Sequence, residues 1–298
     1  MEIKHCKVAI IGGGPAGLTA ALYLGRAQVD TLVIDADMCG GQIISSPLLE
    51  NVPGYYGSGA ELAIKMLDEV QKYPSVQFEN FNKVINVDIL SREEHILTLE
   101  DGSMVSAEYV ICATGSNPIR LPQLESEHTH YCVTCDGALY QDKLVAVIGG
   151  GNSALQYALE LTKYAEKIYV CTNEPFLRGE ESVREKVLNH SKIEVRYCFT
   201  AQSFDGDILT PAEGHSLMVD GIFVAIGYKP NTDYLNAEKC GGLFLTNIIG
   251  NPFDVDNGCD YDNVFVAGDC RLKKYNQVVI AMSDGCQAAL RIISDLEK

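Results

Sequence analysis

Residues 7–27 read KVAIIGGGPAGLTAALYLGRA, and this stretch decides the fold of the chain. It holds a short β-branched run at Val8–Ile11 and then three glycines at G-x-G-x-x-G spacing, Gly12, Gly14 and Gly17. A helical pattern follows directly. Such glycines permit a tight turn, close approach of the backbone to a pyrophosphate and close packing of helix on strand, while the helix N-terminus offers amides to the phosphates. The stretch therefore predicts a dinucleotide-binding βαβ unit.

The next predicted strand supports the same interpretation. It reads TLVID and ends at Asp35. An acidic residue in that place can accept hydrogen bonds from a ribose 2′-hydroxyl. A glycine turn alone is a weak signal, but strand, turn, helix and acid stand here in the expected order.

A second unit of the same kind begins at residues 143–170, KLVAVIGGGNSALQYALELTKYAEKIYV. Gly149, Gly151 and Ala154 form G-x-G-x-x-A, in which alanine is an accepted replacement for the third glycine. Two such starts far apart in the chain predict two Rossmann-like units and not a solenoid repeat.

Three further strands show how the units are connected. VICATG at 110–115 and GIFVAIGYKP at 221–230 each end in a glycine and lead to proline, and NVFVAGD at 263–269 precedes a helix that begins near Gln277. The last strand and turn complete a nucleotide-binding unit far from its start. The simplest organisation is one domain built from both chain ends with the second unit inserted into it.

We therefore predict an α/β fold of two Rossmann-like, three-layer ββα domains, the second inserted into the first. The first domain takes residues 1–115 and 230–298, and the inserted domain takes residues 116–229.

Composition limits the possible partners. The chain has 298 residues, a formal net charge of −17 and 47% hydrophobic residues. This acidic balance argues against nucleic acid and against an anionic membrane surface. No apolar stretch approaches a membrane span, and no secretory signal precedes the first strand. Eleven cysteines, mostly scattered singly, are typical of free thiols in a reducing compartment, so we expect a cytoplasmic protein.

CVTCDG at 132–137 is the exception among the cysteines. A zinc site would need a second pair, but Cys171 and Cys198 are solitary, so no metal site is predicted. Haem attachment would need histidine where Asp136 stands, and a structural disulfide closing so short a loop would remove little chain entropy. A catalytic dithiol of Cys132 and Cys135 suits the pattern, with Asp136 as a candidate acid–base group for the outgoing thiolate.

Two other clusters carry weaker signals. His128 and His130 lie just before the cysteine pair and are interpreted as loop histidines, because the sequence shows no partner for them. Arg271, Lys273 and Lys274 form one of the few basic clusters in this acidic chain. A solvated loop explains that cluster, and it is also a candidate dock for an acidic partner.

Taken together, the motifs resemble the low-molecular-weight thioredoxin reductases, two-domain flavoproteins of the pyridine-nucleotide disulfide oxidoreductase superfamily. The resemblance covers nearly the whole chain. It rests on GGGPAGLTAALY at the start, GGQ at 40–42, ENVPGY at 50–55, ATG at 113–115, CVTCDG, GGGNSA at 149–154, DGIFVAIGYKPNT at 220–232, and VFVAGD, YNQV and DGCQAAL near the end.

This resemblance implies FAD in the domain built from both chain ends, reduction of thioredoxin and, commonly, a homodimer. Cys135 would face the flavin, and Cys132 would exchange with the protein substrate. The residues that match the family's FAD contacts are Gly12, Gly14, Pro15, Ala16, Gly17, Asp35, Gly41, Gln42, Asn51, Thr114, Gly115, Gly268, Asp269, Gln277 and Val278.

One stretch departs from the family pattern. In NADPH-dependent members, the strand after the second glycine turn ends in His-Arg-Arg, whose guanidinium groups grip the 2′-phosphate. Here those positions fall on Cys171, Thr172 and Asn173. Glu174 would repel a phosphate, and it fits poorly as the acid of an NADH site; Arg178 is displaced by one position from the family's later arginine.

Two more departures agree with this one. The chain between Val195 and Gly221 is shorter than in NADPH-using relatives, and Asn276 stands where relatives carry arginine. The profile resembles the ferredoxin-dependent, flavin-containing branch, which implies electrons from reduced ferredoxin. An NADH- or NADPH-dependent reductase with atypical nucleotide contacts is the alternative. A flavin-bound redox sensor is a third reading, against which the intact CVTCDG argues.

Overall fold

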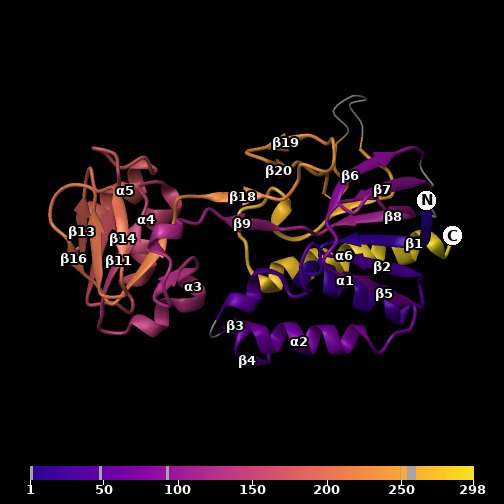
Figure 1. The fold of residues 1–298 in the computed structure, drawn as a ribbon, viewed down its shortest axis with the longest axis horizontal. Coiled ribbons are helices and arrows are strands. Elements are labelled where there is room, and N and C mark those ends of the chain that lie inside the picture. The colour runs from indigo at the N-terminus through magenta and orange to yellow at the C-terminus, as the bar shows by residue number, and fades with distance from the viewer. Residues whose placement is uncertain (1–2, 47–48, 92–93, 249, 254–259) are drawn as a thin grey trace. The chain divides into compact units, whose positions relative to one another are not determined.

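The computed structural model describes residues 3–46, 49–91, 94–248, 250–253 and 260–298. The chain divides into two compact units (Figure 1). The first unit comprises 1–117 and 230–298, and the second comprises 118–229. The boundaries between the units therefore fall after residues 117 and 229, whereas the sequence predicted them after residues 115 and 229. No helix within the described residues is long and apolar enough to cross a membrane.

The first unit is built on a mixed seven-stranded sheet. Its order is β5-β2-β1-β8-β7-β6, with β21 pairing the second half of β8 in parallel. The strands are β1 (Ile3–Ile11), β2 (Thr31–Ile34), β5 (Val76–Glu79), β6 (Val84–Ile89), β7 (His95–Leu99), β8 (Met104–Cys112) and β21 (Val264–Val266). Since β21 comes from the C-terminal segment, both chain ends contribute to one sheet, as the sequence predicted.

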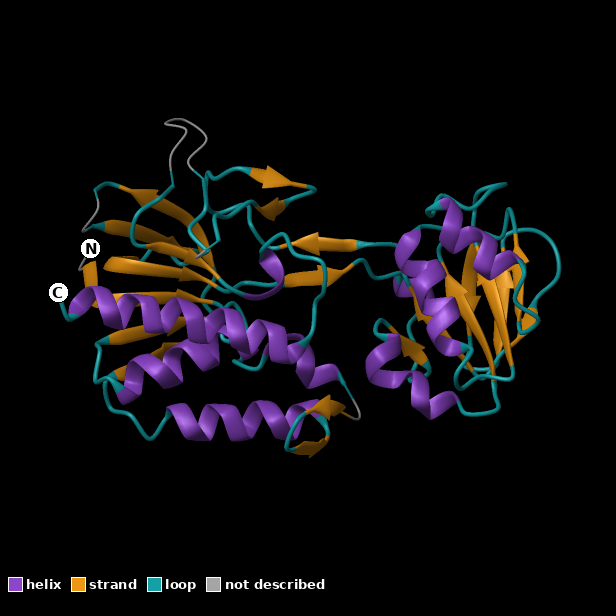
Figure 2. Cartoon of the chain, turned by 180° about the vertical axis from the view of Figure 1, so that it is seen from behind, coloured by secondary structure: helices purple, strands orange, loops and turns teal. Residues whose placement is uncertain are grey.

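The two faces of this sheet are covered differently, which follows from the alternation of side chains along each strand. Val8 and Ile10 of β1 face a core shared with the helices, whereas Ala9 and Ile11 face a second core with Tyr234. Figure 2 shows the three long helices on one side of the sheet. They are α1 (Pro15–Arg26), α2 (Gly59–Val70) and α6 (Val278–Leu296).

The remaining elements of this unit are short. They are η1 (Gly41–Ser45), β3 (Leu49–Val52), β4 (Tyr55–Gly57), β19 (Lys239–Cys240), β20 (Leu243–Phe244) and η4 (Gly268–Cys270). Among them, η1, β3 and η4 carry predicted cofactor residues.

The second unit has a parallel five-stranded sheet in the order β10-β17-β11-β12-β13 and a separate antiparallel sheet, β14-β15-β16. Val145 and Val147 of β11 face the helices, and Ala146 and Ile148 face the antiparallel sheet. Its helices are α3 (Val133–Asp136), η3 (Gly137–Tyr140), α4 (Asn152–Leu161) and α5 (Glu181–Leu188), and η2 (Pro122–Leu124) precedes them. Its strands are β10 (Thr129–His130), β11 (Leu144–Ile148), β12 (Lys167–Cys171), β13 (Ile193–Arg196), β14 (Ala201–Phe204), β15 (Ile208–Pro211), β16 (Leu217–Met218) and β17 (Gly221–Val224).

Each unit is thus a helical layer, a central sheet and a further layer of short strands, which confirms the predicted fold class. The two chain segments that join the units pair with each other as strands β9 (Ser116–Pro118) and β18 (Tyr228–Pro230). Ile119 N donates to Gly227 O at 3.0 Å, and Asn231 N donates to Gly115 O at 3.1 Å. The inserted segment therefore leaves and re-enters the first unit through adjacent strands.

His95 of β7 gives the first unit a pH-dependent stability. Its side chain is completely buried, and burial lowers its pKa to about 4 from an ordinary value near 6.5. The unfolded chain therefore binds the proton more readily, so the unfolding free energy falls as the pH drops from about 6.5 towards 4. We expect a loss of up to about 3 kcal/mol from this group.

Chemical denaturation at several pH values measures this loss. His95→Leu should flatten the dependence of the unfolding free energy on pH between 6.5 and 4, relative to the unmodified chain. Equal slopes for the two proteins would show that His95 is not buried in its neutral form.

Candidate functional site

The first glycine turn has the geometry that its sequence predicted. Gly12 has a φ of +105°, and a Cβ there would lie 2.4 Å from Ala113 O. A Cβ on Gly17 would lie 1.9 Å from Gly12 O. Gly14 precedes α1, which starts with Pro15, and no side chain caps that helix. The first amides of α1 are therefore available to a ligand, as a phosphate cradle requires.

Asp35 follows β2 and lies beside this turn. Its Oδ2 accepts a hydrogen bond from Gly13 N at 2.5 Å, and its Oδ1 accepts one from Asp37 N at 2.9 Å. Burial raises the pKa of this carboxyl. Each oxygen still has a lone pair for a further donor, so the group fits the predicted ribose contact.

Other predicted cofactor residues surround the same turn. A Cβ on Gly41 would lie 2.9 Å from Gly14 Cα, and a Cβ on Gly268 would lie 3.0 Å from Ala16 Cβ. Backbone from η1 and from the C-terminal segment therefore approaches the turn so closely that only glycine fits at Gly268 and Gly41, which both have positive φ.

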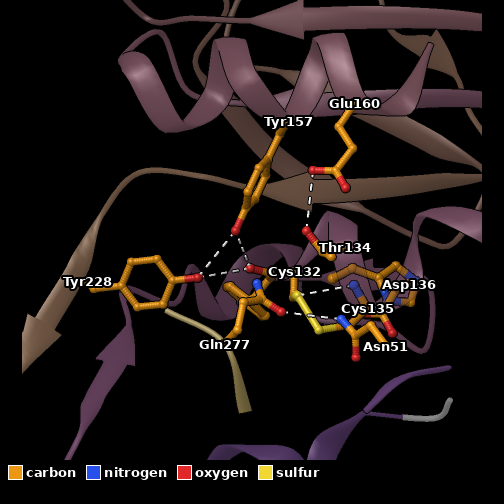
Figure 3. The surroundings of a disulfide bond; sticks show 11 residues. Asn51, Cys132, Thr134, Cys135, Asp136, Tyr157, Glu160, Tyr228 and Gln277 are labelled. Atoms are coloured by element: carbon orange, nitrogen blue, oxygen red, sulfur yellow. Dashed lines mark hydrogen bonds and ion pairs between the residues drawn. A yellow bond between two sulfur atoms is a disulfide. The ribbon is translucent and has the colours of Figure 1, made fainter. Parts of the chain in front are cut away.

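Side chains in this unit are joined across long sequence separations. Gln42 Nε2 donates to Ser116 O, and Asn51 Nδ2 donates to Gln277 Oε1 at 3.3 Å (Figure 3). Thr114 Oγ1 donates to the backbone carbonyl of Asn231 at 2.5 Å. Two further predicted contacts, Gly115 with a φ of +64° and Val278 as the first residue of α6, complete the set.

Asp269 in η4 offers the clearest opening for a ligand. Its Oδ1 is buried and accepts no hydrogen bond from the described residues, and its nearest cation is Lys273 Nζ at 3.4 Å. Burial raises its pKa. A buried oxygen without a donor is costly unless a ligand hydroxyl or water satisfies it. The residues of this unit therefore fit FAD.

The idea that Arg271, Lys273 and Lys274 form a basic dock is wrong for two of the three. Arg271 Nη1 lies 3.5 Å from Asp284 Oδ1, and Lys273 Nζ lies 2.9 Å from Asp284 Oδ2. The two side chains are only 21% and 13% exposed. Asp284 also accepts from Gly268 N at 3.1 Å, so these cations brace the turn and do not face a partner.

In the second unit, Cys132 and Cys135 form a disulfide with a Cα–Cα distance of 5.3 Å (Figure 3). Cys132 is the N-cap of α3, and its sulfur accepts from Cys135 N at 3.2 Å. Thr134 between them donates to Glu160 Oε2 of α4 at 3.3 Å. This geometry places a backbone donor on Cys132, which would stabilise its thiolate after reduction.

Two tyrosines hold the residue before the disulfide, and sequence reasoning missed them. The hydroxyls of Tyr157 and Tyr228 donate to the carbonyl oxygen of Tyr131 at 2.8 and 3.1 Å (Figure 3). Burial raises the pKa of Tyr157, so its hydroxyl keeps its proton and remains a donor. The three residues come from distant segments, and no local motif announces their meeting.

Asp136 is buried, and its partner is His130. Asp136 Oδ2 lies 3.2 Å from His130 Nδ1, and Tyr140 Oη lies 2.6 Å from His130 Nε2. The expectation that His130 is a loop residue without a partner is therefore wrong. His128, by contrast, is 45% exposed and lies 3.7 Å from Glu127, as a loop histidine would.

The second glycine turn keeps its backbone form, and the strand beyond it ends in buried side chains. Cys171 and Thr172 are each 1% exposed, and a Cβ on Gly150 would lie 2.5 Å from Thr172 Oγ1. Thr172 thus packs against the turn, and Cys171 lies in the core with Ala146 and Ile148. Arg178 is exposed, and its backbone N donates to Gly150 O at 2.8 Å.

Comparison with known proteins gives one consistent result. A family model described as pyridine nucleotide-disulphide oxidoreductase matches residues 6–285. A protein from Clostridium pasteurianum, called the 34.2 kDa protein in rubredoxin operon, is 35% identical to this chain. The alignment covers 97% of this chain and 96% of the Clostridium protein. Thioredoxin reductase from Helicobacter pylori is 34% identical, covering 97% and 98%.

Solved structures agree with the sequence relatives. Thioredoxin reductase from Streptococcus pyogenes superimposes with a TM-score of 0.89 at 27% identity, covering 99% of both chains. Thioredoxin reductase from Giardia duodenalis gives a TM-score of 0.87 at 28% identity, covering 99% of this chain and all of its own.

Proposed function

Because this chain belongs to the pyridine nucleotide-disulphide oxidoreductase family and is an FAD-binding flavoprotein that acts on a disulfide, we propose that it is a ferredoxin-dependent thioredoxin reductase. In this function the pair Cys132–Cys135 would receive the electrons that reduced ferredoxin delivers to bound FAD, and the reduced pair would then reduce thioredoxin. The observation that carries the choice of donor is the end of β12, where buried Cys171 and Thr172 replace the cations that a 2′-phosphate requires.

The first unit would hold FAD through the glycine turn, Asp35 and Asp269. The turn and the start of α1 would offer amides to the pyrophosphate, Asp35 would accept from ribose, and Asp269 would accept from another hydroxyl or N–H group of the cofactor. Bound FAD supplies a store for two electrons that a one-electron donor can fill in two successive transfers.

The second unit supplies the thiol chemistry. After reduction, Cys132 is the attacking thiolate, because the Cys135 amide already points at its sulfur. It attacks one sulfur of the thioredoxin disulfide, which forms a mixed disulfide and releases the other sulfur as a thiolate. Cys135 then attacks Cys132, restoring the enzyme disulfide and releasing reduced thioredoxin. Two electrons leave the dithiol, and two thiols are formed.

The alternative is a reductase that takes NADPH or NADH through atypical contacts. Arg178 is the residue with which to test it, because its side chain is exposed and its backbone N donates to Gly150 O of the second glycine turn.

An anaerobic titration of the flavoprotein distinguishes these donors. We expect reduced ferredoxin to bleach the flavin absorbance band fully at about four equivalents per FAD, because the disulfide and the flavin each take two electrons, and stoichiometric NADPH or NADH to leave the band unchanged over minutes. Bleaching by either nucleotide would overturn the ferredoxin assignment. An Arg178→Ala variant, titrated in parallel, should behave like the unmodified protein if ferredoxin is the donor.

A further inference from the structure

Three polar side chains form a continuous chain in the core of the second unit, next to the redox pair in sequence. His130 ends β10, Asp136 ends α3, and Tyr140 ends η3. His130 Nδ1 lies 3.2 Å from Asp136 Oδ2, and His130 Nε2 lies 2.6 Å from Tyr140 Oη. His130 and Asp136 are 8% and 6% exposed. Imidazole therefore links the carboxyl group to the phenol away from bulk water.

The hydrogen-bond inventory of the three groups fixes where the protons lie whenever Asp136 is ionised. The carboxylate then only accepts hydrogen bonds, so the proton between the two groups is on His130 Nδ1, which donates it. Nε2 of the neutral ring then accepts from the Tyr140 hydroxyl. Burial, with the negative charges of Asp136 and Asp220, raises the pKa of Tyr140 to about 12, which keeps that hydroxyl a donor.

The surrounding packing holds the imidazole in this orientation. The rings of His130 and Tyr140 pack on Phe223, with centroid distances of 5.2 and 5.4 Å. A Cβ on Gly221 would lie 2.4 Å from Tyr140 Oη, so this glycine leaves room for the phenol. A strand pair also fixes the register, because His130 of β10 lies opposite Phe223 of β17.

The other oxygen of Asp136 has no such partner. Asp136 Oδ1 is buried and accepts no hydrogen bond from any described residue. Asp136 directly follows Cys135. One oxygen of its carboxyl group is thus held by His130, and the other is free to accept a proton. This division suits a carboxyl group that exchanges protons with thiols.

We propose that His130 is a positioning residue that anchors Asp136 and shares its proton, so that Asp136 acts as the acid and base of thiol–disulfide exchange. The proposal rests on the proposed function of the redox pair. The other charged or titratable groups around His130, Asp136 and Tyr140 are Lys143, Tyr157 and Asp220, and Glu160 lies near Tyr157.

The proton balance of the exchange is complete. When the Cys132 thiolate attacks the substrate disulfide, protonated Asp136 gives its proton to the departing substrate thiolate. Cys135 then returns its own thiol proton to Asp136 as its sulfur attacks Cys132. Cys132 lost its thiol proton to water when it became a thiolate. The second substrate thiolate takes up one proton from water, which closes the balance. During the ionised interval, His130 holds the carboxylate through its Nδ1 proton.

The dependence on the leaving group tests this assignment without ferredoxin or thioredoxin. The purified holoprotein is reduced with dithiothreitol, desalted anaerobically and mixed in single turnover with one of two disulfides. Bis(2-hydroxyethyl) disulfide releases a basic alkyl thiolate that needs a proton, whereas 5,5′-dithiobis(2-nitrobenzoate) releases a stable aryl thiolate that does not.

We expect His130→Ala to lower the rate of reaction with the alkyl disulfide by about 10- to 100-fold. The rate with the aryl disulfide should stay within about twofold of that of the unmodified protein. His130→Asn keeps a donor towards Asp136 but cannot carry a second proton. It should restore part of the rate with the alkyl disulfide, while changing the dependence of that rate on pH. Tyr140→Phe should show the same selectivity with a smaller loss.

Other outcomes would overturn the role of His130. If His130→Asn and Tyr140→Phe each lowered the rates with both disulfides equally, that result would mean that the three linked side chains only support the fold. Complete rescue by His130→Asn, with an unchanged pH profile, would mean that a hydrogen bond suffices and no proton is shared. A failure of thioredoxin reduction with normal disulfide selectivity would instead count against the proposed function alone.

Discussion

Replacement of either redox cysteine abolishes thioredoxin reduction while FAD stays bound; this is the largest effect that we expect. Cys132→Ser and Cys135→Ser each remove one sulfur of the disulfide seen in the second unit. Without both sulfurs, no pair of electrons can be stored as a dithiol, and the mixed disulfide cannot be resolved. We expect the turnover rate to fall by at least about 1,000-fold.

The measurement follows thioredoxin reduction with reduced ferredoxin as donor, together with the FAD content of each variant. Cys198→Ser is the matched control, because Cys198 is an exposed free cysteine of the same unit. It should retain full turnover. Since every residue proposed to contact FAD lies in the other unit, FAD content should equal that of the unmodified protein. Loss of FAD would instead identify the pair as a structural element.

The second large effect concerns the two glycine turns. Gly14→Ala should fold normally, because Gly14 has a φ of −75° and a Cβ there would lie 3.7 Å from Gly41 Cα, its nearest neighbour. The added methyl group would stand where the backbone must approach the pyrophosphate. Overpacking of about 1–3 kcal/mol predicts that FAD affinity falls by about 5- to 160-fold.

Gly151→Ala is the corresponding change in the second turn. Gly151 has a φ of −90°, and a Cβ there would meet no atom within 4 Å. If this turn holds no nucleotide, the variant should keep its FAD and its ferredoxin-dependent turnover. Titration of the FAD-free proteins with FAD gives the affinities. A loss of turnover confined to Gly151→Ala would place a cofactor at the second turn.

The sequence predicted those parts of the fold that depend on local signals. The glycine turns follow from the steric demands of a few neighbouring residues, and Gly12 and Gly17 meet those demands in the structure. Strand lengths were less predictable. The run at Val8–Ile11 belongs to a strand that starts at Ile3, because β8 pairs with it over its whole length.

The errors arose where the fold brings together side chains whose contact no local motif indicates. His130 was interpreted without its partner because Asp136, six residues later, returns to it only after the turn of α3. Arg271 and Lys273 were considered as a dock because Asp284 on α6, which pairs with both, gives no sign of this in the sequence. Pairing of buried charges depends on tertiary placement, which residue spacing does not encode.

The paired strands β9 and β18 have a consequence for how such a protein can arise and be altered. The chain leaves the first unit and returns to it through neighbouring strands, whose backbones are about 5 Å apart. A gene segment encoding residues 118–229 thus has entry and exit points that a single short hairpin could bridge. We expect this segment to be exchangeable for the corresponding segment of a homologous protein without disrupting the sheet of the first unit. The unit with the redox cysteines and the unit with the cofactor residues could then be recombined between homologues during evolution.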